Sequence, residues 1–188
     1  MGEYDKTGNP LLSVLVAIIV VVAVIGGYVW ATYTGPVHTG QVLSVAAHPI
    51  HRELSTGGGL GGLNGGPNVY DEVIVIARVR IKSTTKLPLF LQDEWADLTL
   101  ANGDVQQSLA ASGEDYKKVF IAYPELAAEK QTPMPRGITM TPGQVVDGQL
   151  IFHFPISKQD WDARKAFDIT IGFINQKSLV LHTMAESR

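Results

Sequence analysis

The longest uninterrupted hydrophobic run of the chain extends from Leu11 to Trp30. It contains no charged residue, and Ser13 is its only small polar side chain. About 20 apolar residues in a helix span the roughly 30 Å hydrocarbon core of a bilayer. The pattern therefore predicts a single transmembrane helix over residues 11–33, preceded by a short cytoplasmic N-terminus over residues 1–10.

Two other interpretations of this run fit less well. A buried core helix is usually shorter and interrupted by polar positions. A cleaved signal peptide has a basic leader, an apolar stretch of about 7–15 residues and a small-x-small cleavage site. Here Lys6 is offset by Glu3 and Asp5, and no clean Ala-x-Ala follows the run. The sequence therefore favours an uncleaved anchor.

The placement of basic residues predicts the orientation of this anchor. Lys6 lies just before the run, and the next basic residue after it is Arg52. By the positive-inside rule, this bias favours an N-terminus in the cytoplasm. We therefore expect a single-pass protein of the bacterial cytoplasmic (inner) membrane. A linker over residues 34–39 would lead to a domain in the periplasm or outside.

Alternation of apolar and polar positions predicts strands in the rest of the chain. The clearest strand is 70–82, and others are expected over 41–47, 88–100, 145–154, 167–173 and 179–182. Within 88–100 the apolar parity switches near Asp93 and Glu94, which indicates a β-bulge. The Asn102-Gly103 pair is typical of a tight hairpin. Glycines crowd residues 55–67, which we expect to form a mobile loop.

The apolar spacing changes from two to helical between residues 113 and 123. Tyr116, Val119, Phe120 and Tyr123 follow the i, i+3, i+4, i+7 pattern of one helix face. Ser112 is a candidate cap, and Pro124 is expected to end the helix. The predicted fold class is mainly β: an immunoglobulin-like antiparallel β-sandwich over 40–183, with one short helix and a tail over 184–188.

Composition narrows the function classes. The 188-residue chain has no cysteine, which excludes disulfides, thiolate metal sites and cysteine nucleophiles. Of its 15 Lys and Arg and 18 Asp and Glu, only Lys6, Glu3 and Asp5 precede residue 35. The predicted domain is therefore slightly acidic as a whole, which argues against a nucleic-acid partner.

The pattern resembles that of bacterial membrane-anchored immunoglobulin-like (telokin-like) domain proteins of unknown function. The features that carry the resemblance are the N-terminal span, the Gly-rich segment and the strand 73–81. The segments 95–103 and 141–152 also fit. The resemblance implies a β-sandwich and a location in the cell envelope, and it supplies no catalytic residues.

Candidate chemistry is sparse. His48 and His51, with His38, His153 or His182 and Met134, Met140 or Met184, could form a soft copper site, although ordinary surface histidines fit the spacing better. The acidic residues Asp93, Glu94, Asp97, Glu114 and Asp115 could bind calcium or serve glycoside hydrolysis, but acids near a bulge commonly stay solvated. No serine lies in a Gly-x-Ser-x-Gly elbow. We therefore expect no catalytic residue, no resident cofactor and no metal ligand.

The best candidate for binding is a group of aromatic, apolar and basic residues in the least regular part of the domain. Such residue types are favoured at interface cores. They are Trp95, Tyr116, Phe120, Tyr123, Pro124, Met134 and Arg136. The alternative is that they close one end of the sandwich core.

The sequence thus predicts a membrane-anchored, non-enzymatic binding or accessory module of a cell-envelope protein complex. It would contact membrane lipid through residues 11–33 and an envelope or membrane protein through its domain. The alternative is a periplasmic protein that handles copper or zinc through histidines and methionines.

Overall fold

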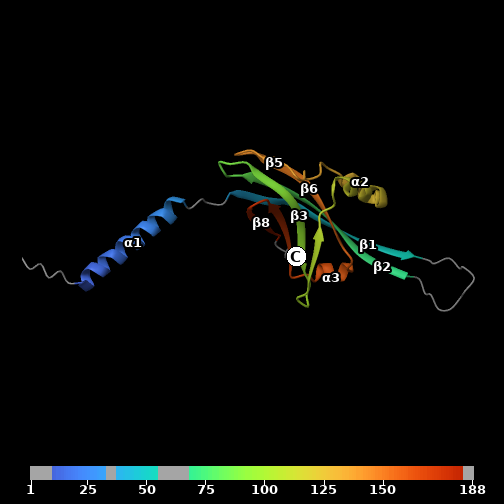
Figure 1. Ribbon diagram of the computed structural model, residues 1–188. Coiled ribbons are helices and arrows are strands. Elements are labelled where there is room, and N and C mark those ends of the chain that lie inside the picture. Colours follow the sequence, from blue (N-terminus) through green and yellow to red (C-terminus); the bar gives the residue numbers. More distant parts are fainter. Residues whose placement is uncertain (1–9, 33–36, 55–67, 184–188) are drawn as a thin grey trace, which may run out of the picture. The chain divides into compact units, whose positions relative to one another are not determined.

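The computed structural model describes residues 10–32, 37–54 and 68–183 and divides the chain into two compact units. The first unit, up to Pro36, contains helix α1 (Pro10–Thr32), and the second begins at Val37 and contains all the strands (Figure 1). The predicted segment before Pro10, the start of the predicted linker, the predicted loop 55–67 and the tail 184–188 lie outside the described residues.

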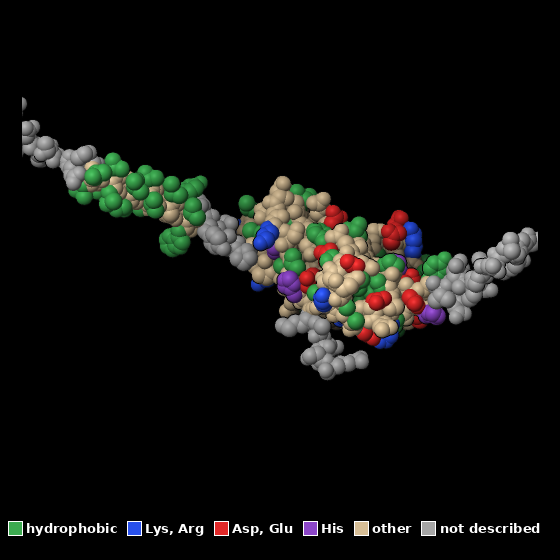
Figure 2. All heavy atoms as spheres, turned by 90° about the horizontal axis from the view of Figure 1, so that it is seen from below, with side chains coloured by type: hydrophobic (Ala, Val, Ile, Leu, Met, Phe, Trp, Pro, Cys, Tyr) green, Lys and Arg blue, Asp and Glu red, His purple; other side chains and the backbone are tan. Residues whose placement is uncertain are grey.

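Helix α1 confirms the predicted N-terminal apolar helix. Its segment Leu11–Trp30 has a mean hydropathy of 2.8, and the protein buries none of it. Among the described residues, it is the one helix long and apolar enough to cross a membrane. Figure 2 shows hydrophobic side chains along the whole of α1, whereas charged side chains are spread over the other unit. Since a core helix would be mostly buried, that interpretation does not fit.

The second unit is an antiparallel β-sandwich, as predicted. Its strands are β1 (His38–Leu54), β2 (Asn68–Ser83), β3 (Leu89–Thr99), β4 (Val105–Leu109), β5 (Thr139–Met140), β6 (Val145–Phe154), β7 (Ala166–Phe173) and β8 (Gln176–Thr183). One sheet has the order β1-β2-β6, and the other has the order β4-β3-β7-β8, with β5 beside β3. The chain crosses between the sheets repeatedly, as it does in immunoglobulin-like domains.

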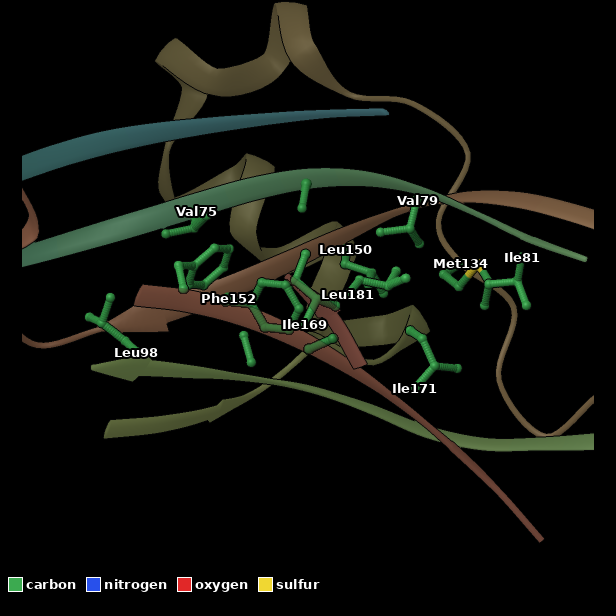
Figure 3. Packing of buried hydrophobic residues seen from close by; sticks show 14 of the residues in the cluster. Val75, Val79, Ile81, Leu98, Met134, Leu150, Phe152, Ile169, Ile171 and Leu181 are labelled. Carbon is green, nitrogen blue, oxygen red and sulfur yellow. The ribbon is translucent and has the colours of Figure 1, made fainter. Parts of the chain in front are cut away.

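The main hydrophobic core lies between the two sheets. Figure 3 shows side chains of β2 and β6, such as Val75 and Phe152, pointing toward side chains of β7 and β8, such as Ile169 and Leu181. The predicted inward face of β2, which alternates from Val73 to Ile81, is fully buried. The alternation explains the strand, because every second side chain points to the same face and those on the inward face are all apolar.

Strand β3 contains the predicted bulge. Leu91 pairs with Phe173 and Glu94 pairs with Ile171, so β3 has one extra residue between the two pairs. An extra residue reverses which side chains face inward. As a result Leu91 is buried before the bulge, and Glu94 and Ala96 are buried after it. The expectation that the acids here stay solvated is therefore wrong for Glu94.

The connections contain more helix than predicted. Helix α2 (Gly113–Ala122) confirms the expected short helix, and a 3-10 helix, η1 (Pro124–Glu129), follows it. The pattern of apolar residues does not predict α3 (Lys158–Asp162), which lies between β6 and β7. Ser157 caps α3 by accepting a hydrogen bond from the amide of Asp160 at 3.1 Å. This cap brings Trp161 into the core, 5.3 Å from the ring of Phe167.

Two predicted local details differ. The turn between β3 and β4 is longer than two residues, since the amide of Leu100 bonds to the carbonyl of Asp104 at 2.8 Å. Gly103 takes a positive φ of 97° there, which favours glycine. At the start of α2 the hydroxyl of Ser112 donates to the side chain of Asp115 at 2.7 Å rather than capping the backbone.

The outer face of the β1-β2-β6 sheet is also covered. Ile74, Ile76 and Ile151 lie on this face and form a second hydrophobic cluster with α2 and η1. The amide of Ala111, just before α2, donates to the carbonyl of Ile151 at 2.8 Å and holds the connection against β6. The middle of this sheet is therefore apolar on both faces, which explains the isoleucines among the polar positions of β2.

Candidate functional site

The predicted partner-binding residues are divided between the interior and the surface. Tyr116, Phe120 and Met134 are 2%, 8% and 6% exposed, so the prediction that they form part of an exposed patch is wrong. Tyr116 and Phe120 pack on the isoleucines of β2 and β6, and Met134 belongs to the main core. The alternative, that such residues serve the core, holds for these three.

The phenol of Tyr116 explains why an aromatic residue with a hydroxyl lies in this cluster. Its oxygen forms a very short hydrogen bond with Oε1 of Gln149 and lies 2.6 Å from the carbonyl oxygen of Gln131. Gln149 is itself buried and donates to the carbonyl of Glu129 at 2.8 Å. Tyr116 thus fastens the chain after η1 to strand β6, which is a structural role.

The remaining four predicted residues are at least partly accessible. Trp95 and Tyr123 are half-buried, Pro124 is exposed, and Arg136 is half-buried. Trp95 lies against Gly172, where an added Cβ would approach its ring carbon Cζ3 to 3.1 Å. Tyr123 and Pro124 are consecutive residues at the junction of α2 and η1.

Tyr123 belongs to a polar cluster at this junction. Its hydroxyl donates to Oε1 of Glu72 at 2.6 Å, and Nε2 of His153 lies 2.8 Å from Oε2 of the same carboxylate. The guanidinium of Arg52 stacks over the ring of Tyr123, 4.5 Å from its centre. Burial and the bond to Glu72 raise the pKa of Tyr123 to about 12. Burial alone would raise the pKa of Glu72, but hydrogen bonds from Tyr123 and His153 bring it below its usual range.

Glu94 is the most perturbed acid among the described residues. Its side chain has no exposed surface, and Nε of Arg136 donates to its Oε2 at 2.6 Å. The same guanidinium donates to the carbonyl of Ala110 at 2.5 Å, which joins β3 to the end of β4. Burial raises the pKa of Glu94 to about 7, although Arg136 opposes this shift. The parity switch indicated the bulge, but nothing in the sequence linked Glu94 to an arginine 42 positions away.

The chemistry of this pair is limited by its enclosure. A carboxyl that titrates near neutrality is a candidate proton acceptor. A substrate would nevertheless have to displace Arg136 to reach it, because none of the Glu94 side chain is exposed. Two other acids of the predicted cluster, Asp97 and Asp115, bond to different partners. Asp97 accepts from Gln107 at 3.0 Å, and Asp115 accepts from Ser112 and Lys118.

The histidines of the metal hypothesis are not brought together. His48 pairs with Glu129 at 3.0 Å, whereas His51 pairs with Asp71 at 2.7 Å. His38 stacks on Phe173 with 4.4 Å between ring centres. His153 and His182 contact other carboxylates, and Met134 and Met140 are buried in the main core. In the described part of the chain, no group of three His, Cys, Asp or Glu residues is arranged to hold a metal ion. Met184 lies outside the described residues.

A shallow depression of about 420 Å³ lies between the β1-β2 hairpin and the start of α3. Its lining includes His51, Asp71 and Ser157. An Asp–His pair with a nearby serine resembles part of a hydrolase triad, which requires the serine hydroxyl to bond to the histidine. The hydroxyl of Ser157 instead donates to Oδ2 of Asp160 at 2.8 Å and caps α3. Ser157 therefore has the geometry of a helix cap and not that of a triad serine.

No protein-family model matches the sequence, and no curated protein matches it. Solved structures of similar fold include the yjhA protein from Bacillus subtilis, at 11% identity and a TM-score of 0.43, with 80% of this chain and 94% of that chain covered. An uncharacterized β-sandwich protein from Clostridium difficile 630 has 9% identity and a TM-score of 0.35, with 81% and 89% covered. A conserved hypothetical protein from Bacillus anthracis has 13% identity and a TM-score of 0.30, with 78% and 99% covered.

Proposed function

We propose that this chain is a membrane-anchored, non-enzymatic binding or accessory module of a cell-envelope protein complex. The observation that carries the proposal is the exposure of α1. Each residue from Leu11 to Trp30 is exposed, and the segment has a mean hydropathy of 2.8. An apolar surface of this length is stable only when lipid or another apolar partner covers it.

The organisation of the sandwich supports a binding role over catalysis. Groups that commonly act in enzymes have structural partners here: Glu94 is held by Arg136, Ser157 caps α3, and Tyr116 bridges to Gln149. A candidate catalytic base has to lie within hydrogen-bond reach of a substrate proton. Glu94 lacks the exposure that this requires.

The proposed orientation places the sandwich outside the cytoplasm. Lys6 is the basic residue beside the span, and the positive-inside rule puts it in the cytoplasm. Protease added to intact spheroplasts should then degrade the sandwich while a cytoplasmic marker survives. Protection of the sandwich until the membrane is opened would contradict this orientation.

The proposed partner surface is the accessible part of the α2–η1 junction. Ile121 is 77% exposed, and Tyr123 and Pro124 follow it two and three positions later. The charged side chains of Arg52 and Glu72 lie beside Tyr123. This arrangement fits the usual form of an interface, which has an apolar centre and a polar rim. A tethered domain meets neighbours of the same membrane at high effective concentration, so a small surface is sufficient.

Photocrosslinking in native membranes tests this proposal. A photoreactive amino acid would replace Ile121 in the full chain, and Val180 on β8, also exposed, would be the matched control position. We expect mass spectrometry to identify one recurrent membrane or envelope protein from position 121 and none from position 180. A recurrent neighbour from position 180 alone would contradict the proposed surface. The absence of a recurrent neighbour at both positions would contradict the accessory role.

A further inference from the structure

One end of the sandwich differs from the rest of its surface. The start of β1 and the end of β2 meet there, since His38 pairs with Ser83. The loop 84–88, the turn 141–144 and the turn after β7 lie at the same end, as the bond from the amide of Ser83 to the carbonyl of Gln144 shows. Nε2 of His38 lies 2.6 Å from the carbonyl of Lys177, which ties the β7–β8 turn to this end as well.

This end exposes three large apolar side chains, two of which are direct neighbours. Leu87, Phe90 and Ile174 are 71%, 45% and 46% exposed. Phe90 and Ile174 are direct neighbours, because the amide of Ile174 donates to the carbonyl of Phe90 at 2.9 Å. Single exposed apolar residues are ordinary on a protein surface. Adjacent exposed apolar side chains, close to the segment that leads to α1, indicate a surface that contacts another molecule or a membrane.

The same end is basic, although the domain as a whole is slightly acidic. Lys82, Lys86 and Lys177 are exposed there. The sequence has no acidic residue between Glu72 and Asp93, or between Asp168 and Glu186. Exposed lysines beside exposed apolar side chains are the combination that binds the surface of an anionic bilayer.

The chain itself limits how far this end can be from a membrane. Helix α1 ends at Thr32 and β1 begins at His38. At most about 3.6 Å per residue, the connection reaches roughly 20 Å when fully extended. If α1 spans a bilayer, this end of the sandwich is therefore held within that distance of the lipid headgroups, whatever the conformation of the connection.

We propose that this end of the sandwich docks on the anionic headgroups of the bilayer that holds its own anchor. We name it the anchor-end patch: Leu87, Phe90 and Ile174 with Lys82, Lys86 and Lys177. The apolar side chains enter the headgroup region, and the lysines contact lipid phosphates. The proposal rests on the proposed membrane anchor and adds to it a fixed orientation of the domain.

The absence of cysteine makes a site-specific test possible in the full chain. Phe90→Cys and Ile174→Cys would each be labelled with an environment-sensitive fluorophore in proteoliposomes containing phosphatidylglycerol. Val105→Cys, at the opposite end of β3 and β4 and 62% exposed, is the matched control. Ile18→Cys in α1 reports insertion of the anchor.

We expect emission from positions 90 and 174 to shift to shorter wavelength and to be quenched by spin-labelled lipid, while position 105 is unaffected. The shift should shrink in phosphatidylcholine alone and in the triple variant Lys82→Glu/Lys86→Glu/Lys177→Glu. Three results would overturn the proposal. The first is equal emission at positions 90 and 105, and the second is a shift that does not depend on phosphatidylglycerol. The third is a shift seen only in native membranes, which a protein partner would cause. Quenching at position 18 in such a result leaves the anchor intact. Its absence there would overturn anchor and patch together.

Discussion

Helix α1 and strand β2 are built from the same residue types, but one is helical and the other is extended. Both are rich in valine and isoleucine, which favour strands because of their branched side chains. In β2 one face is continuously apolar while Arg78 and Arg80 interrupt the other, and both edges pair with neighbouring strands. In α1 the apolar residues surround the single small polar side chain of Ser13, and no polar stripe marks one face of the helix.

The difference shows what each segment requires from its surroundings. The backbone of β2 is satisfied by β1 and β6, and its side chains are buried by protein. A helix satisfies its backbone groups within itself, which is the requirement for a single segment in lipid. Branched apolar residues are therefore compatible with either structure, and what covers their side chains distinguishes the buried strand from the proposed membrane span.

The largest effect should come from the core of the sandwich. Phe154 has no exposed surface and lies 6.1 Å from the ring of Phe167. Phe154→Ala should lower the free energy of unfolding by about 3–5 kcal/mol, because it removes buried apolar surface and leaves a cavity. Chemical denaturation of the full chain in mild detergent, followed by near-ultraviolet circular dichroism, measures this.

The matched change in α1 is Ile18→Ala. Since Ile18 belongs to the other compact unit and is not part of the sandwich core, the unfolding transition of the sandwich should not move. An equal loss of stability in both variants would contradict the separation of the two regions.

The next effect concerns the buried carboxyl group of Glu94, which is paired with Arg136. The pKa of Glu94 is raised from 4.5 to about 7, so the folded chain binds a proton that the unfolded chain releases between these pH values. The stabilisation is therefore complete below pH 4.5 and is lost as the pH rises to about 7. The total change is up to roughly 3 kcal/mol.

Comparison with Glu94→Gln isolates this contribution. The amide keeps the shape of the side chain and can still accept a hydrogen bond from Arg136, but it does not titrate. The free energy of unfolding of the unsubstituted chain should fall more steeply between pH 4.5 and 7 than that of Glu94→Gln. Parallel profiles would mean that Glu94 has an ordinary pKa in the folded state.

A smaller effect is expected on the outer face of the β1-β2-β6 sheet. Tyr116→Phe keeps the ring on the isoleucines but leaves Gln149 without its phenol partner. The expected loss is about 1 kcal/mol, the net contribution of one hydrogen bond, because Oε1 of Gln149 still accepts from the amide of Gln131. Tyr123→Phe, at the half-buried rim, is the control and should lose less. Equal losses would indicate that α2 does not seal this face.

Periodicity predicted the features that depend on neighbouring residues in the sequence. The inward face of β2, the bulge of β3 and the helix over Gly113–Ala122 are local patterns, and the structure contains all three. The pattern could also have shown that something covers the outer face of β2, because Ile74 and Ile76 stand among its polar positions. It could not identify α2 as the cover, which depends on how the chain returns.

The candidate site was less predictable because its contacts are distant in sequence. Arg136 was selected as a partner-binding residue, but it holds Glu94, 42 positions earlier. Helix α3 was missed because it has only five residues, too few for a helical period to appear. The accessible part of the predicted surface, which includes Tyr123 and Pro124, stays a prediction.

The proposed membrane anchor is tested most directly by washing membranes with alkaline carbonate and measuring the intact mass of the chain that stays in the pellet. The intact mass of the chain in the membrane pellet should include residues Leu11–Trp30, because the exposed apolar helix would be held in the bilayer. A chain released by carbonate would contradict the anchor. So would a chain recovered without these residues, since a cleaved signal peptide would produce that result.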